Sequence, residues 1–319
     1  MKKLLLIAIC FVSFLGKAQI KGSHKDLKDL TSRPLIVEIL EEDSKTLKDL
    51  SKPKRAGDLY FYKNFIKEFN EDFKNFVQKY WKLNRNIEYK GSSEIEALNK
   101  QKNKSYAVIR FLPLLEKDNF APKSGNCIPS ISYSTIENDV QCRTFISSNS
   151  LGSEKTFSEK DYRIALETLQ SSVNWSIENG KSINGEDYIE KMATANCSKL
   201  TGKTLLVADN AMLKESMKEG AKQNYGENLK FVSEIELNDA YANKNKNSAV
   251  LITVPYGVMT GGAGGGFAAV SLSMFVFYKI IVDCETGEIL WMYKPHGLMI
   301  NPKSGLTEKE FKFMANCKI

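Results

Sequence analysis

Two glycine-containing stretches of the chain resemble phosphate-binding motifs. The sequence LTGKT at 200–204 resembles the end of a phosphate-binding loop, which also needs a glycine where Cys197 stands and a helix directly afterwards. Here an apolar run of strand type follows instead. The sequence GGGFAA at 264–269 fits a loose dinucleotide-binding pattern, but the run after it also reads as a strand, so no helix N-terminus would face a pyrophosphate. Neither stretch predicts a nucleotide cofactor.

The chain has few residues that could perform histidine-dependent or metal-dependent chemistry. The chain contains two histidines, His24 and His296. Neither lies in a nucleophile motif, and the sequence contains no Gly-x-Ser-x-Gly. The carboxylates at 41–42, and the pair Glu236 and Asp239, are explained as helix caps and solvated faces. We therefore predict no catalytic, cofactor-binding or metal-binding residue. Two separated carboxylates that only the fold brings together stay open as an acid/base pair.

The most unusual local feature is the glycine-rich run TGGAGGG at 260–266, between two apolar runs. Residues with almost no side chain cannot pack a core, but they can fold over a ligand or cross a neighbouring chain. The alternative is a loop tip with no binding role. If the protein binds a partner, we expect the contact to involve this loop and its flanking aromatic residues, namely Tyr256, Gly261, Gly262, Gly264, Gly265, Gly266 and Phe267.

The first 18 residues have the pattern of a secretory signal peptide: two lysines, an apolar run and small residues near Ala18. About 12 apolar residues fall short of the roughly 20 that a transmembrane helix needs. We expect cleavage after Ala18, export to the periplasm or beyond, and no stable transmembrane helix in the mature chain. Lipidation at Cys10 is disfavoured because Ile9 is large where lipoprotein signals carry a small residue.

Charge and cysteine content narrow the classes of partner. The chain of 319 residues has a net charge of +7, and its basic residues alternate with Glu, Asp and Asn rather than forming a stripe. We therefore expect no nucleic-acid binding. An odd number of cysteines follows the signal, so at most two disulfides can form within the chain, and the sequence leaves their pairing open. These cysteines are Cys127, Cys142, Cys197, Cys284 and Cys317.

A pattern of strand and helix signals occurs twice along the chain. The tetrapeptide Ser-Glu-Ile-Glu starts at Ser93 and again at Ser233, each time followed by an Asn/Lys-rich stretch and an apolar run. A serine with a glutamate three residues later is typical of a capping box. Ser93 with Glu96, and Ser233 with Glu236, therefore predict two helix starts.

The same order of elements surrounds both helix starts. In the second half we predict strands at 203–209, 229–232, 248–254 and 267–283, a helix at 210–226, and a hairpin turn at Thr286–Gly287. In the first half we predict strands at 34–40, 86–89 and 105–114, a helix near 59–81, and a hairpin at 128–146.

Three predicted helices have features of their own. The helix near 59–81 carries an aromatic stripe that is typical of a core face, formed by Tyr62, Phe65, Phe69, Phe73, Phe76 and Tyr80. Between the two copies we predict a helix at 158–179, capped by Ser158 and ended by Gly180, and another near 187–199.

We therefore predict an α/β (α+β) protein with two tandem, diverged β-α-β-α-β-β-β units, mixed sheets and joining helices. The predicted boundaries are a signal peptide at 1–18, a first α/β unit at 19–149, a helical connector at 150–200 and a second α/β unit at 201–319. Two diverged copies indicate an ancient duplication rather than a solenoid, since arrays need three or more units.

The order of elements around 200–295, ending in VDCETGEILW, resembles the α/β unit of periplasmic assembly proteins. These are the curli-export channel family and the N-terminal domain of the Tol-system propeller protein. The Lys/Asn-rich style and the Ala-Gln end of the signal also resemble secreted proteins of Bacteroidota. The resemblance implies a role in the cell envelope and names no reaction.

These observations favour a secreted or periplasmic, non-catalytic module that binds or assembles something in the cell envelope, with an unknown envelope protein or ligand as its partner. A secreted carboxylate-based hydrolase is one alternative. A membrane-associated or pore component is the other, based on the glycine-rich loop and the apolar run at 267–282. The sequence leaves the oligomeric state open.

Overall fold

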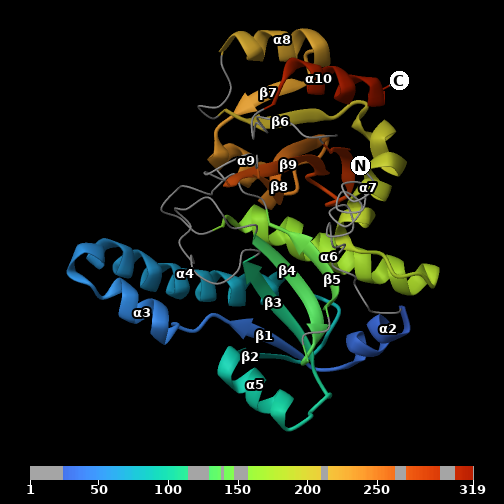
Figure 1. The fold of residues 1–319 in the computed structure, drawn as a ribbon. Coiled ribbons are helices and arrows are strands. Elements are labelled where there is room, and N and C mark those ends of the chain that lie inside the picture. The colour runs from blue at the N-terminus through green and yellow to red at the C-terminus, as the bar shows by residue number, and fades with distance from the viewer. Residues whose placement is uncertain are drawn as a thin grey trace, which may run out of the picture.

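The computed structural model describes residues 24–113, 129–137, 140–146, 157–209, 215–262, 271–294 and 306–318, which form two five-stranded sheets with helices around them (Figure 1). The strands of the first sheet are β1 (Leu35–Ile39), β2 (Ile87–Gly91), β3 (Ala107–Pro113), β4 (Pro129–Thr135) and β5 (Val140–Phe145). Those of the second sheet are β6 (Thr204–Ala208), β7 (Leu229–Val232), β8 (Ser248–Gly262), β9 (Ser271–Asp283) and β10 (Ile289–Tyr293).

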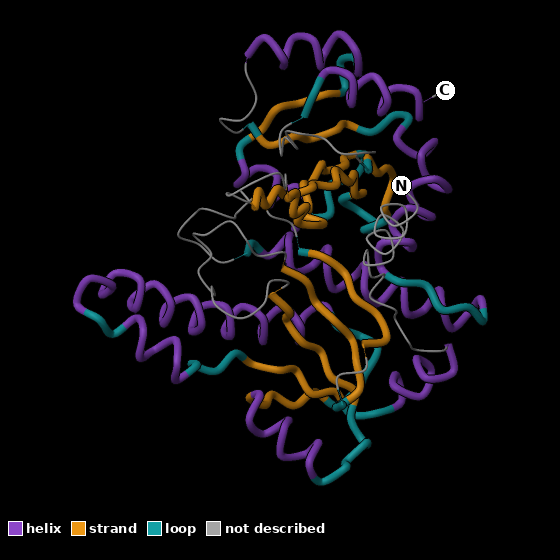
Figure 2. Tube along the Cα trace, in the orientation of Figure 1, coloured by secondary structure: helices purple, strands orange, loops and turns teal. Residues whose placement is uncertain are grey.

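Helices surround both sheets, as the tube in Figure 2 shows. The helices are α2 (His24–Ser32), α3 (Ser44–Leu50), α4 (Ala56–Tyr80), α5 (Ser92–Lys100), α6 (Glu159–Asn179), α7 (Gly185–Asn196), α8 (Glu215–Tyr225), α9 (Glu234–Ala242) and α10 (Glu308–Ala315). Short 3-10 turns are η1 (Pro53–Arg55), η3 (Cys197–Leu200) and η4 (Asn316–Lys318). The predicted α/β class with mixed sheets is confirmed.

Both sheets have the same strand order and the same strand directions. The first runs β2-β1-β3-β4-β5 and the second runs β7-β6-β8-β9-β10. In each sheet, the first strand along the chain is parallel to the second and the third. The fourth strand is antiparallel to the third, and the fifth is antiparallel to the fourth. Below, the first unit means α2–α6 with β1–β5, and the second unit means η3–α10 with β6–β10.

The sheet registers show which residues correspond between the units. Leu35 pairs with Ile87 and Ala107, and in the second sheet Leu205 pairs with Leu229 and Ala249. From 87 to 113 the correspondence therefore runs without a gap, each residue matching the one 142 positions later. The repeated tetrapeptide is spaced by 140 positions. Its two copies are thus two residues out of structural register.

This offset makes one predicted capping box wrong. Helix α5 has Gly91 as its N-cap, and the Gly91 N–H donates to Glu94 Oε2 at 3.0 Å. Ser93 lies inside the helix, where its hydroxyl donates to Glu41 at 2.8 Å. The prediction for Ser233 is confirmed. Its side chain accepts a hydrogen bond from the N–H of Glu236, the third residue of α9, and its own N–H donates to the Glu236 carboxylate.

One face of the first sheet is covered by α2, α4 and α6. The core there contains Leu27 and Leu30 from α2 and Leu166 from α6, all at most 1% exposed. The aromatic stripe predicted on α4 is confirmed as a core face, since Phe69 and Phe73 are fully buried. Helix α5 covers part of the opposite face.

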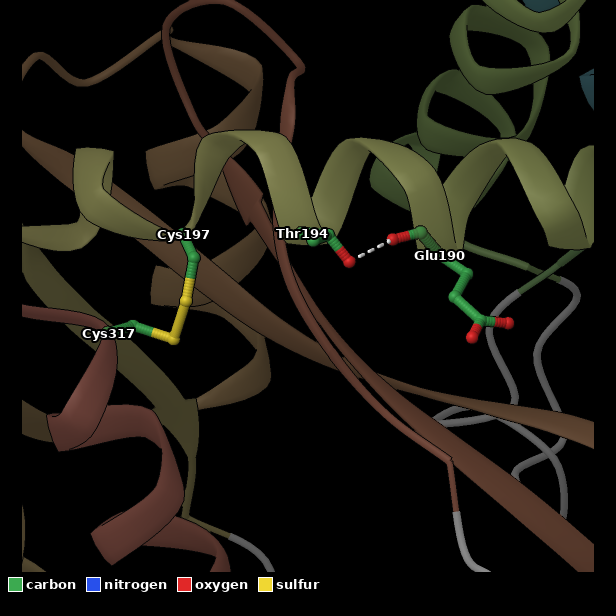
Figure 3. The surroundings of a disulfide bond; sticks show 4 residues. All are labelled: Glu190, Thr194, Cys197 and Cys317. Atoms are coloured by element: carbon green, nitrogen blue, oxygen red, sulfur yellow. Dashed lines mark hydrogen bonds between the residues drawn. A yellow bond between two sulfur atoms is a disulfide. The ribbon is translucent and has the colours of Figure 1, made fainter.

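The second sheet is covered on both faces. Helices α8 and α10 lie side by side on its outer face, and α7 and α9 cover the inner face, towards the first unit (Figure 1). A disulfide joins Cys197 in η3 to Cys317 in η4, with Cα atoms 5.1 Å apart (Figure 3). The bond ties together the beginning and the end of the second unit.

Helix α6 belongs to the first core, although the sequence placed it in a connector. It begins after the N-cap Ser158 and ends at Gly180, whose φ is 64°, as predicted. Residues 157–163 read FSEKDYR, and residues 306–312, at the start of α10, read LTEKEFK. Each helix starts with a capping box and packs on its own sheet. Helices α6 and α10 are therefore corresponding elements of the two units.

The glycine–lysine stretch at 200–204 also has a counterpart. Residues 200–207 read LTGKTLLV and the corresponding residues 30–37 read LTSRPLIV. Gly202 has a φ of 83° and leads straight into β6. The stretch is the turn that enters the first strand of each unit, which agrees with its rejection as a phosphate-binding loop.

Candidate functional site

A cleft of about 620 Å³ lies where the two units meet. Its floor is the middle of α6, which lies between the first sheet and the second unit (Figure 1). The walls come from the end of α4, from α7, from Lys244 after α9 and from the turn at 286–289 between β9 and β10. Because five segments distant in sequence build the cleft, no local motif marks it.

A hydrogen-bonded network fixes the floor of the cleft. Glu167 on α6 accepts from Arg163 Nε at 2.9 Å and from the Tyr241 hydroxyl at 3.2 Å. Arg163 also donates to the Tyr241 carbonyl at 2.7 Å, and its guanidinium lies 4.6 Å from the centre of the Tyr241 ring. Burial, with the nearby Glu167 carboxylate, raises the pKa of Tyr241 far above its usual value, so this phenol stays protonated. The network joins α6 to α9.

The β9–β10 turn closes against the same carboxylate. Gly287 has a φ of 73°, and a Cβ at this position would lie 2.7 Å from Glu167 Oε2. Asp283 shapes the turn by accepting the backbone N–H groups of Glu285 and Thr286, each at 2.9 Å. Burial alone would raise the pKa of Asp283, but the ion pair with Lys203 and these hydrogen bonds outweigh it and lower the pKa. The turn predicted at Thr286–Gly287 is confirmed.

The rim on the side of α4 is also built from paired groups. Lys79 Nζ lies 2.6 Å from Glu159 Oε1, and the Tyr80 hydroxyl donates to the same oxygen. The hydrogen bond from Lys79 to Glu159 raises the pKa of Lys79. The side chain of Gln170 binds the Tyr80 carbonyl at 3.0 Å and accepts from the Lys82 N–H at 2.6 Å. These contacts anchor the end of α4 on α6.

The charges of the cleft do not balance. Two carboxylates line it, and both have cationic partners: Glu167 pairs with Arg163, and Glu288 pairs with Lys199 at 2.8 Å. Lys82 and Lys244 also line the cleft, and within the described part of the chain neither ammonium group forms an ion pair. The cleft therefore offers two cations to a ligand and no uncommitted carboxylate among the residues described.

The remaining lining is suited to polar rings and hydroxyl groups. Tyr188 and Tyr80 each expose part of their rings, beside the polar side chains of Thr168, Ser171 and Asn196. Burial raises the pKa of Tyr188, so it presents a neutral hydroxyl. Such a lining, with two nearby ammonium groups, can hold an anionic ligand that also carries hydrogen-bonding groups.

The loop predicted from the sequence lies mainly outside the described residues. Gly264, Gly265, Gly266 and Phe267 fall in that part of the chain. Tyr256, Gly261 and Gly262 lie in β8, which continues to Gly262 instead of ending at residue 254. There Gly261 pairs with Leu272 and Gly262 with Ser271 of β9, so these two glycines are ladder residues rather than loop residues.

The other chemistry-bearing residues have structural surroundings. Glu41 caps the start of α5 and Glu236 that of α9. His24 begins α2, whereas His296 and Cys127 lie outside the described residues. Cys142 and Cys284 are buried and form no disulfide within the described residues, and burial raises the pKa of Cys284 to about 12. No group of three or more His, Cys, Asp or Glu in the described ranges could hold a metal ion.

No protein-family model matches the chain, and searches of curated proteins and of solved structures find no match. Among the described helices, none has the length and apolar composition required to cross a bilayer.

Proposed function

We propose that the protein is an exported, non-catalytic binding module that holds a small anionic ligand in the cleft between its two units. The observation that carries the proposal is the charge imbalance: Glu167 and Glu288 each form an ion pair with a cation of the chain, while Lys82 and Lys244 remain for a ligand. A general base needs an uncommitted group near its target. Paired carboxylates therefore favour binding over a carboxylate-based hydrolysis.

The ligand class follows from the lining. Carboxylate or phosphate groups would pair with the two ammonium groups, and the tyrosine rings and hydroxyl groups would contact the remainder of the ligand. A volume of about 620 Å³ suits a molecule of a few rings or residues.

Export is supported by the disulfide between Cys197 and Cys317, because disulfides persist in oxidising compartments such as the periplasm. The signal-like residues 1–18 agree with this proposal but lie outside the described residues. An envelope partner, as the resemblance to periplasmic assembly proteins implies, is part of the same proposal.

Titration calorimetry tests the cleft. We expect saturable binding of at least one of citrate, glucuronate and inorganic phosphate at low salt, and none of glucose. Changing Lys82→Gln with Lys244→Gln should weaken that binding about tenfold, which corresponds to about 1.4 kcal/mol. The matched control is Lys222→Gln with Lys230→Gln, which removes two exposed charges from the second unit that do not line the cleft. No binding of any anion, or equal losses in both double variants, would overturn the proposal.

A membrane-associated role is the second candidate, favoured by the length of the β8–β9 ribbon. Within the described residues of the first unit, the ladder between β3 and β4 is followed as far as Pro113 with Pro129, whose counterparts are Pro255 and Phe277. The second unit continues for six further pairs, up to Gly262 with Ser271. Flotation with vesicles of phosphatidylethanolamine and phosphatidylglycerol tests it. We expect the mature chain to float and a variant with Asn-Gly in place of 257–276 to stay at the bottom.

A further inference from the structure

Helices α6 and α10 occupy corresponding places, but their outer faces have different surroundings. The correspondence FSEKDYR to LTEKEFK places Lys312 where α6 has Arg163, and Phe313 where α6 has Ile164. Arg163 and Ile164 are buried between the two units, with 2% and 6% of their surfaces exposed. On α10 the equivalent residues are exposed, and Phe313 keeps 42% of its surface accessible.

The contact made by α6 shows what such a face binds. Ile164 packs in the core of the second unit together with Ala240 and Tyr241 from the end of α9. Arg163 donates to the Tyr241 carbonyl at 2.7 Å, and the Lys244 N–H donates to the same oxygen at 3.2 Å. The face of α6 thus binds the C-terminal end of the second helix of a unit, where free carbonyl groups attract cations.

The first unit presents the same structure at the end of α5, on its surface. Asn99 corresponds to Tyr241, and its carbonyl accepts the Lys102 N–H at 2.8 Å. Lys102 and Lys244 share a left-handed conformation, with φ of 55° and 52°. Asn99 and Lys102 are exposed, and Leu98 beside them is half-buried. The backbone that receives Arg163 in the second unit is therefore reproduced on the outside of the first.

We propose that α10 of one molecule binds the end of α5 of a second copy, in the way that α6 binds the end of α9 within the chain. Phe313 would cover Leu98, and Lys312 would donate to the Asn99 carbonyl. Phe313 is preordered for this contact because its ring stacks on Tyr293, with centroids 6.5 Å apart and planes at 19°.

The contact is head-to-tail, since each copy contributes a different surface. Such contacts build open chains or rings rather than two-fold dimers. The residue that corresponds to Glu167 of α6 is Asn316, directly after α10, so the contact between copies lacks the Arg163–Glu167 ion pair. We therefore expect association weaker than a typical specific interface, with a Kd above about 10 μM.

Sedimentation velocity over a range of concentrations tests the proposal. The full mature chain should shift to larger species as its concentration rises towards about 500 μM, fifty times the lower bound on the Kd. Phe313→Glu should abolish the shift. The control Tyr60→Glu, which makes the same kind of change at an aromatic residue 72% exposed on α4, should leave it unchanged. Circular dichroism and the Tm establish that each variant is folded. Lys312→Glu is a second variant of α10, which changes the exposed lysine and leaves the stacked Phe313 ring in place.

Mixing complementary variants separates a head-to-tail contact from a symmetric one. Asn99→Arg should also abolish self-association, because it places a cation opposite Lys312. In a mixture of the two variants, the Asn99→Arg protein keeps an intact α10 and the Phe313→Glu protein keeps an intact end of α5. The mixture should therefore form one-to-one pairs and nothing larger. A wild type that stays monomeric throughout, or an Asn99→Arg variant that still associates, would overturn the proposal.

Discussion

One sheet face is polar over part of its area in the first unit, next to the apolar cluster under α5, whereas the corresponding area is apolar in the second unit. The side chains in question in the first sheet are Glu38, Arg110, Ser132 and Ser134. Their counterparts in the second sheet are Ala208, Ile252, Ile280 and Val282. Strand order and register are nevertheless identical. The sheet is thus specified by its backbone register and its other face, while the composition of this face varies.

The difference follows what covers each face. The apolar face of the second unit packs against α7, α9 and the edge of α6 in one core. In the first unit Arg110 forms an ion pair with Glu38 at 3.0 Å and donates to the carbonyls of Thr135 and Ile136. Burial lowers the pKa of Arg110, and the Glu38 carboxylate partly offsets this effect. Every charge placed in this sheet therefore needs its own partner.

The ends of the units are secured differently too. In the first unit, Leu27 and Leu30 of α2 pack into the core beneath α6. The residues that correspond to them in the second unit are Cys197 and Leu200, and Cys197 is bonded to Cys317 after α10. Leu200 keeps the apolar packing of Leu30, whereas Cys197 takes the place of Leu27 and adds a covalent bond that the first unit lacks among its described residues.

Loss of this disulfide should cause the largest decrease in the free energy of unfolding. Replacing Cys197 and Cys317 by serine should lower the free energy of unfolding by about 3 to 5 kcal/mol, because the bond closes a loop with a sequence separation of 120 residues. Hydrogen exchange should accelerate in β6–β10 and stay unchanged in β1–β5. Wild-type protein under reducing conditions should behave in the same way, and equal acceleration in both sheets would contradict the difference between the units.

The polar face of the first sheet gives the next effect. Arg110→Ile should cost about 3 kcal/mol, since it leaves the partly buried Glu38 carboxylate without its cation. The double variant Glu38→Ala with Arg110→Ile copies the second unit and should recover most of that loss. Urea unfolding followed by circular dichroism measures both. A double variant as unstable as the single one would show that the two sheets do not tolerate the same residues.

Most of the fold could be predicted because its signals are local. Apolar runs located the strands, and Ser158 with Gly180 bounded α6. The register of the repeat could not be predicted, because identical letters drew attention to Ser93 and Ser233, whereas the sheet pairing aligns Gly91 with Ser233. A glycine at an N-cap leaves no side-chain signal, so Glu94 was the residue that marked the true start.

The candidate site could not be predicted, because its residues come from segments that lie far apart in the sequence. Lys82 and Lys244 read as ordinary surface lysines, and each becomes part of a cleft only through the packing of α6 between the units. Gly287 was identified as a turn residue, but its approach to Glu167 depends on a helix 120 positions earlier in the chain. Sequence spacing carries no information about such contacts.

The contact between the turn and α6 gives a medium effect. Gly287→Ala should destabilise the protein by about 2 to 3 kcal/mol, because the methyl group meets the Glu167 carboxylate and the backbone keeps a left-handed φ. Gly202→Ala is the matched control: its φ is 83°, and no neighbouring atom of the described residues lies within 4 Å of the place its methyl group would take. It should cost only about 1 to 2 kcal/mol. Equal losses in urea unfolding would mean that Glu167 moves away freely.

The smallest effect tests the register of the repeat itself. Ser233→Ala should cost about 1 kcal/mol, because the hydroxyl caps the N–H of Glu236 at the start of α9. Ser93→Ala, at the other copy of the tetrapeptide, removes an exposed hydrogen bond to Glu41 inside α5 and should cost at most about 0.5 kcal/mol. Glu94→Ala should cost more than Glu96→Ala, since Glu94 returns the capping hydrogen bond and Glu96 makes only an exposed pair with Lys100. If Ser93→Ala proved as costly as Ser233→Ala, helix α5 would begin at Ser93, and the identical letters rather than the sheet pairing would give the true correspondence.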